Sequence, residues 1–123
     1  MLIALITDFG HRDSYVGVMK GVIRCESPDI EIVDVTHSIE SFSIPEAQYV
    51  LYSSVRYFPA GSVFCVVVDP GVGSSRRCLA ATDGRYSFVL PDNGVLSAVE
   101  SPELRVHAID ETAFQFVSST FHG

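Results

Sequence analysis

The chain has 123 residues, 47% of them hydrophobic and 19% charged, which is typical of one folded globular domain and unlike a disordered segment. Its formal net charge is −7, from 15 acidic and 8 basic residues, and the basic residues form no continuous stripe. Because neutralisation of phosphates supplies most of the affinity for DNA and RNA, we expect no nucleic-acid partner.

The cysteines and the amino-terminal segment indicate a cytoplasmic protein. Cys25, Cys65 and Cys78 are odd in number and lack metal-ligand spacing, so we expect neither a disulfide framework nor a metal site. The first apolar run follows no Lys or Arg and is interrupted at Asp8, which is too short for a signal peptide or a membrane span. We therefore expect no contact with a membrane.

The first 35 residues predict a strand, a helix and a second strand. Leu2 to Thr7 is a continuous apolar run, typical of a strand buried on both faces. Apolar residues recur at helical spacing from Tyr15 to Ile23, with Asp13 as the expected N-cap. Residues 30–35 form a short apolar run and predict the second strand.

The next segment repeats this order. Ser43 and Glu46 have the spacing of a capping box, and the apolar residues after them predict a helix over 43–57. Residues 63–68 are the most apolar run and predict a third strand. Such alternation implies right-handed crossovers and a parallel sheet with helices on its faces.

The pattern changes in the second half of the chain. Asp83-Gly84 separates apolar runs at 79–82 and 86–90 and predicts a β-hairpin, and residues 104–109 predict a final strand. The expected fold class is α/β: a Rossmann-like three-layer domain with a mainly parallel sheet, plus a hairpin in the second half.

Three polar residues, Asp8, His37 and Asp69, follow the predicted parallel strands, where ligands bind in open α/β sheets. Asp8 could accept hydrogen bonds from a ribose diol, or it could cap the following turn. Gly71 and Gly73 let the backbone turn sharply after Asp69, so that Arg76 could fold back and point with Asp69 into one cleft. The alternative is an ordinary strand-to-helix loop with a surface arginine.

Two further segments have structural and functional interpretations. Pro91-Asp92-Asn93-Gly94 is most economically a tight turn, and a functional role for Asn93 is the alternative. His122, one residue before the end of the sequence, is in isolation typical of a solvated terminal residue.

Taken together and in this order along the chain, these motifs match the pattern of a known protein family. The segments are Thr7-Asp8-Phe9-Gly10, Asp13, Tyr15-Val16-Gly17, Lys20-Gly21, Ile32-Val33-Asp34 through His37, Phe58-Pro59 with Gly61, Val67 to Gly73 with Arg76, Pro91 to Gly94, and Thr120-Phe121-His122-Gly123. Together they resemble the S-adenosyl-L-methionine (SAM) hydrolases that form adenosine, relatives of the bacterial fluorinase and chlorinase. The similarity extends from residue 2 to residue 123.

The resemblance implies a reaction and a set of site residues. The family hydrolyses SAM to adenosine and L-methionine by attack of an activated water at ribose C5′, and SAM is the substrate, so no cofactor is expected. The catalytic residues implied are Asp69, Arg76 and His122. The substrate-binding residues implied are Asp8, Phe9, Thr120 and Phe121.

The resemblance also implies an assembly and leaves alternatives open. Residues 1–123 correspond to the family's N-terminal α/β domain; a C-terminal β-rich domain is absent from this chain, and the intact protein is expected to be a homotrimer that binds SAM or adenosine. SAM-dependent halogenases are one alternative, but they have tyrosine at the position of Asp69 and Tyr-Ser at His122-Gly123. A non-catalytic nucleoside-binding or assembly module is the other, because the isolated chain lacks one wall of the site.

Overall fold

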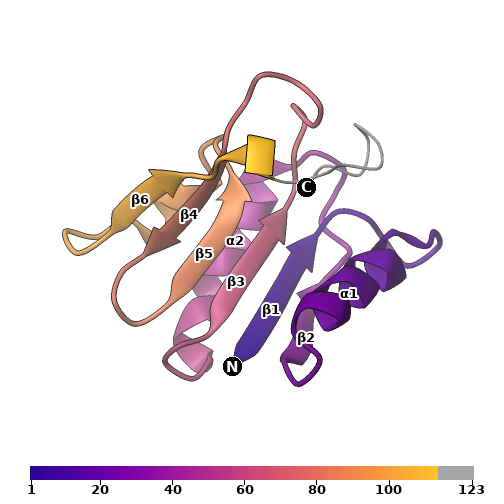
Figure 1. Cartoon of the computed structure of the whole chain (residues 1–123). Coiled ribbons are helices and arrows are strands. Elements are labelled where there is room, and N and C mark those ends of the chain that lie inside the picture. Colours follow the sequence, from indigo (N-terminus) through magenta and orange to yellow (C-terminus); the bar gives the residue numbers. More distant parts are fainter. Residues whose placement is uncertain (114–123) are drawn as a thin grey trace.

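A computed structural model describes residues 1–113 of the chain (Figure 1). The strands are β1 (Leu2–Thr7), β2 (Glu31–Thr36), β3 (Val63–Val67), β4 (Cys78–Thr82), β5 (Ser87–Pro91) and β6 (Arg105–Ala108). The α-helices are α1 (Tyr15–Glu26) and α2 (Ile44–Ser54), and short 3-10 turns follow at η1 (Val55–Tyr57), η2 (Val95–Val99) and η3 (Glu111–Ala113).

The strands form one sheet with the order β2-β1-β3-β5-β4-β6. β1 pairs in parallel with β2 and β3, and β3 pairs in parallel with β5. β4 is antiparallel to both of its neighbours. It is joined to β5 at Asp83-Gly84, where Gly84 has a φ of 87°, a conformation that glycine adopts without steric cost. The predicted mainly parallel sheet and its hairpin are therefore confirmed.

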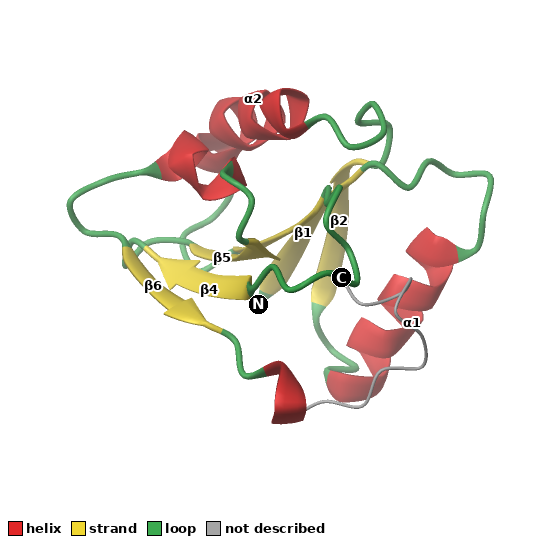
Figure 2. Ribbon diagram, turned by 90° about the horizontal axis from the view of Figure 1, so that it is seen from above, coloured by secondary structure: helices red, strands yellow, loops and turns green. Residues whose placement is uncertain are grey.

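Helices cover both faces of the sheet, as the view from above shows (Figure 2). On one face, Met19 of α1 packs against Leu5 and Val67. On the other face, α2 contacts β1 and η2, and its Ala47 and Leu51 are buried in the larger core. The predicted three-layer α/β architecture is confirmed.

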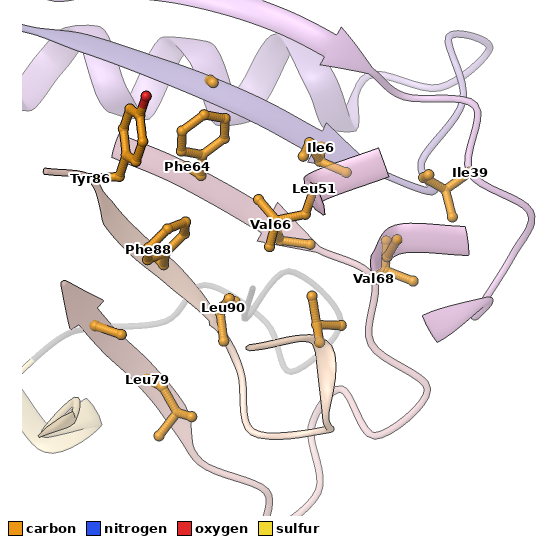
Figure 3. Close-up of a cluster of buried hydrophobic side chains, with 14 residues drawn as sticks. Ile6, Ile39, Leu51, Phe64, Val66, Val68, Leu79, Tyr86, Phe88 and Leu90 are labelled. Atoms are coloured by element: carbon orange, nitrogen blue, oxygen red, sulfur yellow. The ribbon is translucent and has the colours of Figure 1, made fainter. Parts of the chain in front are cut away.

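Phe64 lies at the centre of the larger core (Figure 3). Its ring centroid is 5.1 Å from that of Phe58, 5.8 Å from that of Tyr86 and 5.9 Å from that of Phe88. Aromatic pairs at these separations add to the free energy gained from burial. This cluster packs the start of β3 against its neighbour β5.

The start of α1 differs from the predicted cap, whereas the predicted N-cap of α2 is present. Asp13 is not the N-cap of α1: Ser14 holds that position with helical backbone angles, and no side chain caps the helix there, so the prediction was wrong. At α2, the Ser43 hydroxyl accepts a hydrogen bond from Glu46 N at 3.4 Å, as predicted. The Glu46 carboxylate instead accepts from Glu40 N at 3.0 Å, which ties the preceding loop to the helix.

Phe64→Ala is expected to lower the free energy of unfolding by about 3–5 kcal/mol, because it removes a fully buried ring and leaves a cavity. Urea denaturation followed by circular dichroism would measure this change. Tyr57→Ala is the matched control, since Tyr57 is 80% exposed and its loss is expected to change stability little. Equal effects of the two substitutions would contradict the assigned core.

Candidate functional site

The loops that carry the candidate residues leave the sheet at one edge. β1 and β3 are parallel neighbours, and Thr7, the last residue of β1, pairs with Val67, the last residue of β3. Asp8 follows directly after the first of these residues, and Asp69 follows two positions after the second. Their backbones therefore meet at the carboxyl edge of adjacent strands, where open α/β sheets bind ligands (Figure 1).

Asp69 and Arg76 form a buried ion pair at this edge. Arg76 Nε donates a hydrogen bond to Asp69 Oδ2, and the side chains of Arg76 and Asp69 are only 10% and 3% exposed. The other carboxylate oxygen, Oδ1, accepts from Gly71 N at 2.9 Å. Charged side chains this deeply buried require their partners, so the pair holds the carboxylate in one orientation. The approach of Arg76 to Asp69 that the sequence predicted is confirmed.

Gly71 leaves room for this pair. A Cβ atom at this position would lie 3.1 Å from Ser74 Oγ, 3.3 Å from Arg76 Cγ and 3.4 Å from Asp69 Oδ1. The first two separations are tighter than ordinary van der Waals contact. Gly73, with a φ of 76°, supplies the turn that returns the chain towards the sheet. The two glycines thus serve the close approach of Arg76 to Asp69.

Arg76 has two further partners that the sequence did not indicate. Its Nη1 donates to Cys78 Sγ at 2.8 Å and lies 3.4 Å from Glu111 Oε1. Burial, reinforced by the hydrogen bond with Glu111, raises the pKa of the Cys78 thiol to about 11, so the thiol is neutral near pH 7. Asp69, Arg76 and Cys78 line a small hollow beside the ends of β3 and β5. The guanidinium is therefore fixed on several sides.

The carboxylate of Asp8 bridges two loops. Its Oδ2 accepts a hydrogen bond from Phe42 N at 2.8 Å, across a separation of 34 residues. Phe42 has a φ of 63°, the one positive φ outside glycine within residues 1–113, and the bond to Asp8 supports this unfavourable conformation. The turn after β1 is capped by the Thr7 hydroxyl, which accepts from Phe9 N at 3.2 Å. Asp8 therefore does not cap its own turn.

Asn93 fixes the exit of β3 from the other side. Its side-chain amide donates to the carbonyl of Val68, the residue before Asp69, at 2.8 Å. Its Oδ1 accepts from Val95 N at 3.3 Å, and Asn93 N donates to Pro91 O at 2.9 Å. The predicted tight turn is confirmed, and its asparagine also restrains the backbone that carries Asp69.

The other predicted residues differ in what the structure says of them. The ring of Phe9 lies 5.6 Å from that of Tyr15 and packs against the cluster of Leu5, Met19 and Val67, and its role in binding substrate stays a prediction. The last three predicted residues, Thr120, Phe121 and His122, lie outside the described residues. Within residues 1–113, no group of three or more His, Cys, Asp or Glu could hold a metal ion, and no helix is long and apolar enough to cross a membrane.

Comparison with known protein families agrees with the resemblance inferred from the motifs. The model of the SAM hydroxide adenosyltransferase N-terminal domain matches residues 3–123. The chain belongs to this family.

Named relatives of this SAM hydroxide adenosyltransferase domain include hydrolases and fluorinases. An (R)-S-adenosyl-L-methionine hydrolase of Methanocaldococcus jannaschii is 40% identical over 129 residues, which cover 99% of this chain and 48% of the relative. A fluorinase of Actinopolyspora mzabensis is 29% identical, over 97% of this chain and 46% of the relative. The chain spans about half the length of these curated relatives.

A solved structure shares the fold. An uncharacterized conserved protein from Thermotoga maritima superimposes with a TM-score of 0.90 at 41% identity, over 99% of this chain and 49% of that chain. This SAM hydroxide adenosyltransferase domain therefore has the α/β architecture of a relative of similar sequence.

Gly71→Ala is expected to destabilise the protein by about 1–3 kcal/mol, because the added methyl group would push against Ser74 and Arg76. Gly17→Ala is the matched control. Gly17 is an exposed glycine within α1 whose Cβ would meet nothing within 4 Å, and alanine there is expected to stabilise the helix by about 0.5–1 kcal/mol. Urea denaturation of both variants checks the opposite signs; a stabilising effect of Gly71→Ala would contradict the close approach.

Proposed function

We propose that this chain supplies the catalytic part of a SAM hydrolase, which converts SAM and water to adenosine and L-methionine. The observation that supports this proposal most is the buried pair of Asp69 and Arg76 at the sheet edge that also carries Asp8. Sequence identity of 36–41% to several proteins named (R)-S-adenosyl-L-methionine hydrolase supports the same substrate.

The chemistry of SAM sets what such a site must do. The water oxygen forms a bond to ribose C5′, the C5′–S bond breaks, and its electron pair stays on sulfur, which leaves as the neutral thioether of methionine. The leaving group needs neither a general acid nor a cofactor. The difficulty is the nucleophile, because bulk water is a very weak acid and gives up its proton reluctantly. The protein must therefore hold one water in line with the C5′–S bond and accept its proton.

Asp69 is the proposed base for this water, together with His122. The carboxylate is oriented by Arg76 Nε and Gly71 N, and each of its oxygens keeps a second lone-pair direction. The guanidinium of Arg76 would stabilise the charge that develops on the attacking oxygen. His122 is assigned by the family resemblance alone, since it lies outside the described residues.

The substrate's ribose is the proposed ligand of Asp8. Its Oδ2 is occupied by Phe42 N, and the described residues give no partner for its Oδ1. Asp8 is a half-buried residue, and its carboxylate can accept hydrogen bonds from the hydroxyl groups of a ribose, which are donors. We assign Phe9, Thr120 and Phe121 to the same substrate site on the basis of the resemblance.

The halogenase alternative is disfavoured by charge. A halide ion would have to lose its hydration shell beside the carboxylate of Asp69, and like charges at close range repel strongly away from water. A water molecule meets no such penalty and can donate a hydrogen bond to the same group.

We further propose that the intact protein is a cytoplasmic homotrimer, which is compatible with three free cysteines and the net charge of −7.

Asp69→Asn, made in the protein together with the second half that relatives possess, is expected to lower kcat at least about 100-fold because the base is lost. KM should change little if Asp69 acts on water rather than on SAM. Chromatography of adenosine formed from SAM measures both constants. Asp92→Asn is the control, because it neutralises an exposed carboxylate paired with Arg77. If Asp69→Asn weakened SAM binding as much as it lowered kcat, the assignment of Asp69 as the base would be wrong.

The non-catalytic alternative is tested by incubating SAM with this chain alone and with the separately expressed second half. Adenosine formed only when both are present supports the hydrolase. Binding of SAM or adenosine without turnover in either case favours a nucleoside-binding or assembly module.

A further inference from the structure

A buried histidine, His37, joins the ends of β1 and β2. It follows β2 directly, and its side chain is fully buried. Its Nδ1 is 2.8 Å from the Thr7 hydroxyl at the end of β1, and its Nε2 is 2.8 Å from Asp34 Oδ1. Asp34 in turn accepts from Lys20 of α1 at 2.6 Å. The contacts thus run from the surface of α1 to the last residue of β1.

The charges in this network favour one tautomer of the His37 ring. Burial raises the pKa of Asp34, but the interactions with Lys20 and His37 outweigh it, and the net shift is downward. An ionised carboxylate beside Nε2 favours the proton on that nitrogen, although the contact lies off the N–H direction. Nδ1 then accepts from the Thr7 hydroxyl, whose oxygen accepts from Phe9 N.

The backbone of His37 restrains the same loop a second time. Its carbonyl accepts from Gly10 N at 2.7 Å, and Ile39 N donates to Thr7 O at 3.4 Å. The loop that contains Asp8 is therefore held on both sides, at Thr7 before it and at Gly10 after it. The carboxylate of Asp8 itself is held by Phe42 N.

We propose that His37 is a positioning residue for substrate: through Thr7 and Gly10 it fixes the loop that presents the Asp8 carboxylate to the ribose hydroxyls. The link to substrate rests on the proposed function, whereas the link from His37 to Asp8 rests on the contacts above. Asp8 binds a diol more tightly if its carboxylate is held in place beforehand, because a freely rotating group loses entropy on binding. His37 supplies this restraint without touching the substrate.

Substitutions at Thr7 test the proposal, because removal of the ring of His37 would leave a cavity in the core. Thr7→Val keeps the shape of the side chain and removes the hydroxyl, whereas Thr7→Ser keeps the hydroxyl. Ser62→Ala is the matched control. Ser62 is equally buried and donates to Pro59 O at 2.7 Å, but it lies at the amino end of β3, the opposite edge of the sheet.

The first measurement is amide hydrogen exchange at Phe42, whose N–H is bonded to Asp8. Thr7→Val is expected to speed exchange at this amide roughly fivefold to tenfold, about the equilibrium value of one hydrogen bond. Thr7→Ser should keep exchange at Phe42 slow. Ser62→Ala should leave exchange at Phe42 unchanged, even if it lowers the melting temperature of the protein as much as Thr7→Val does. Unchanged exchange in Thr7→Val would overturn the proposal.

The second measurement compares the affinities of adenosine and 2′,3′-dideoxyadenosine by calorimetry in the full protein. The wild type should prefer adenosine, and Thr7→Val should lose most of that preference, whereas a loss of general stability would weaken both ligands equally. A preference that persists in Thr7→Val overturns the positioning role. If the wild type itself shows no preference, the proposed ribose contact of Asp8 fails, and faster exchange at Phe42 would still support the restraint of Asp8 through the Thr7 hydroxyl, which contacts both His37 and Phe9 N.

Discussion

The pairing of β1 with β2 on one side and β3 on the other is the constraint on which the site depends. All three strands run in parallel, so their carboxyl ends meet at one edge, and residues that are distant in the sequence become neighbours there. The register of β1 against β3 determines how the two loops align, because Thr7 is opposite Val67 and both loops therefore begin at the same level of the sheet. The apolar clusters on both faces hold this register, since a shift by one residue would turn every buried side chain towards the wrong face.

Each loop at this edge has its own restraint. The loop after β3 is held by the pair of Asp69 and Arg76, by Asn93 at the preceding carbonyl, and by the close approach at Gly71. The loop after β1 is held by His37 and by the bond from Phe42 to Asp8. Buried polar groups of this kind add little net stability compared with apolar packing. Their value is geometric, because a site functions only if its polar groups stay in fixed positions.

Local sequence patterns were enough to predict the strands and helices, whereas they did not predict several contacts in the site. Apolar runs and the Asp83-Gly84 turn predicted the sheet and its hairpin, because period and turn chemistry are local properties. The approach of Arg76 to Asp69 could also be predicted, since only six residues lie between them and two of these are glycines. Glu111 lies 35 residues from Arg76, and His37 lies 30 residues from Thr7, so no spacing rule could join them. The prediction of Asp13 as the N-cap was wrong because α1 starts two residues after Asp13, at Tyr15.

The arrangement of acidic groups bears on why water and not an anion would be the nucleophile. Under the proposed function, Asp8 and Asp69 face one cationic substrate from adjacent strands, which lie about 4.8 Å apart. A carboxylate near a sulfonium lowers the energy of the bound cation, but attack removes that positive charge, so ground-state attraction alone would slow the reaction. The site gains only if Asp69 interacts more strongly with the water as it loses its proton. The buried bond from Arg76 fits this requirement under the proposed function, because it holds the carboxylate of Asp69 in one orientation.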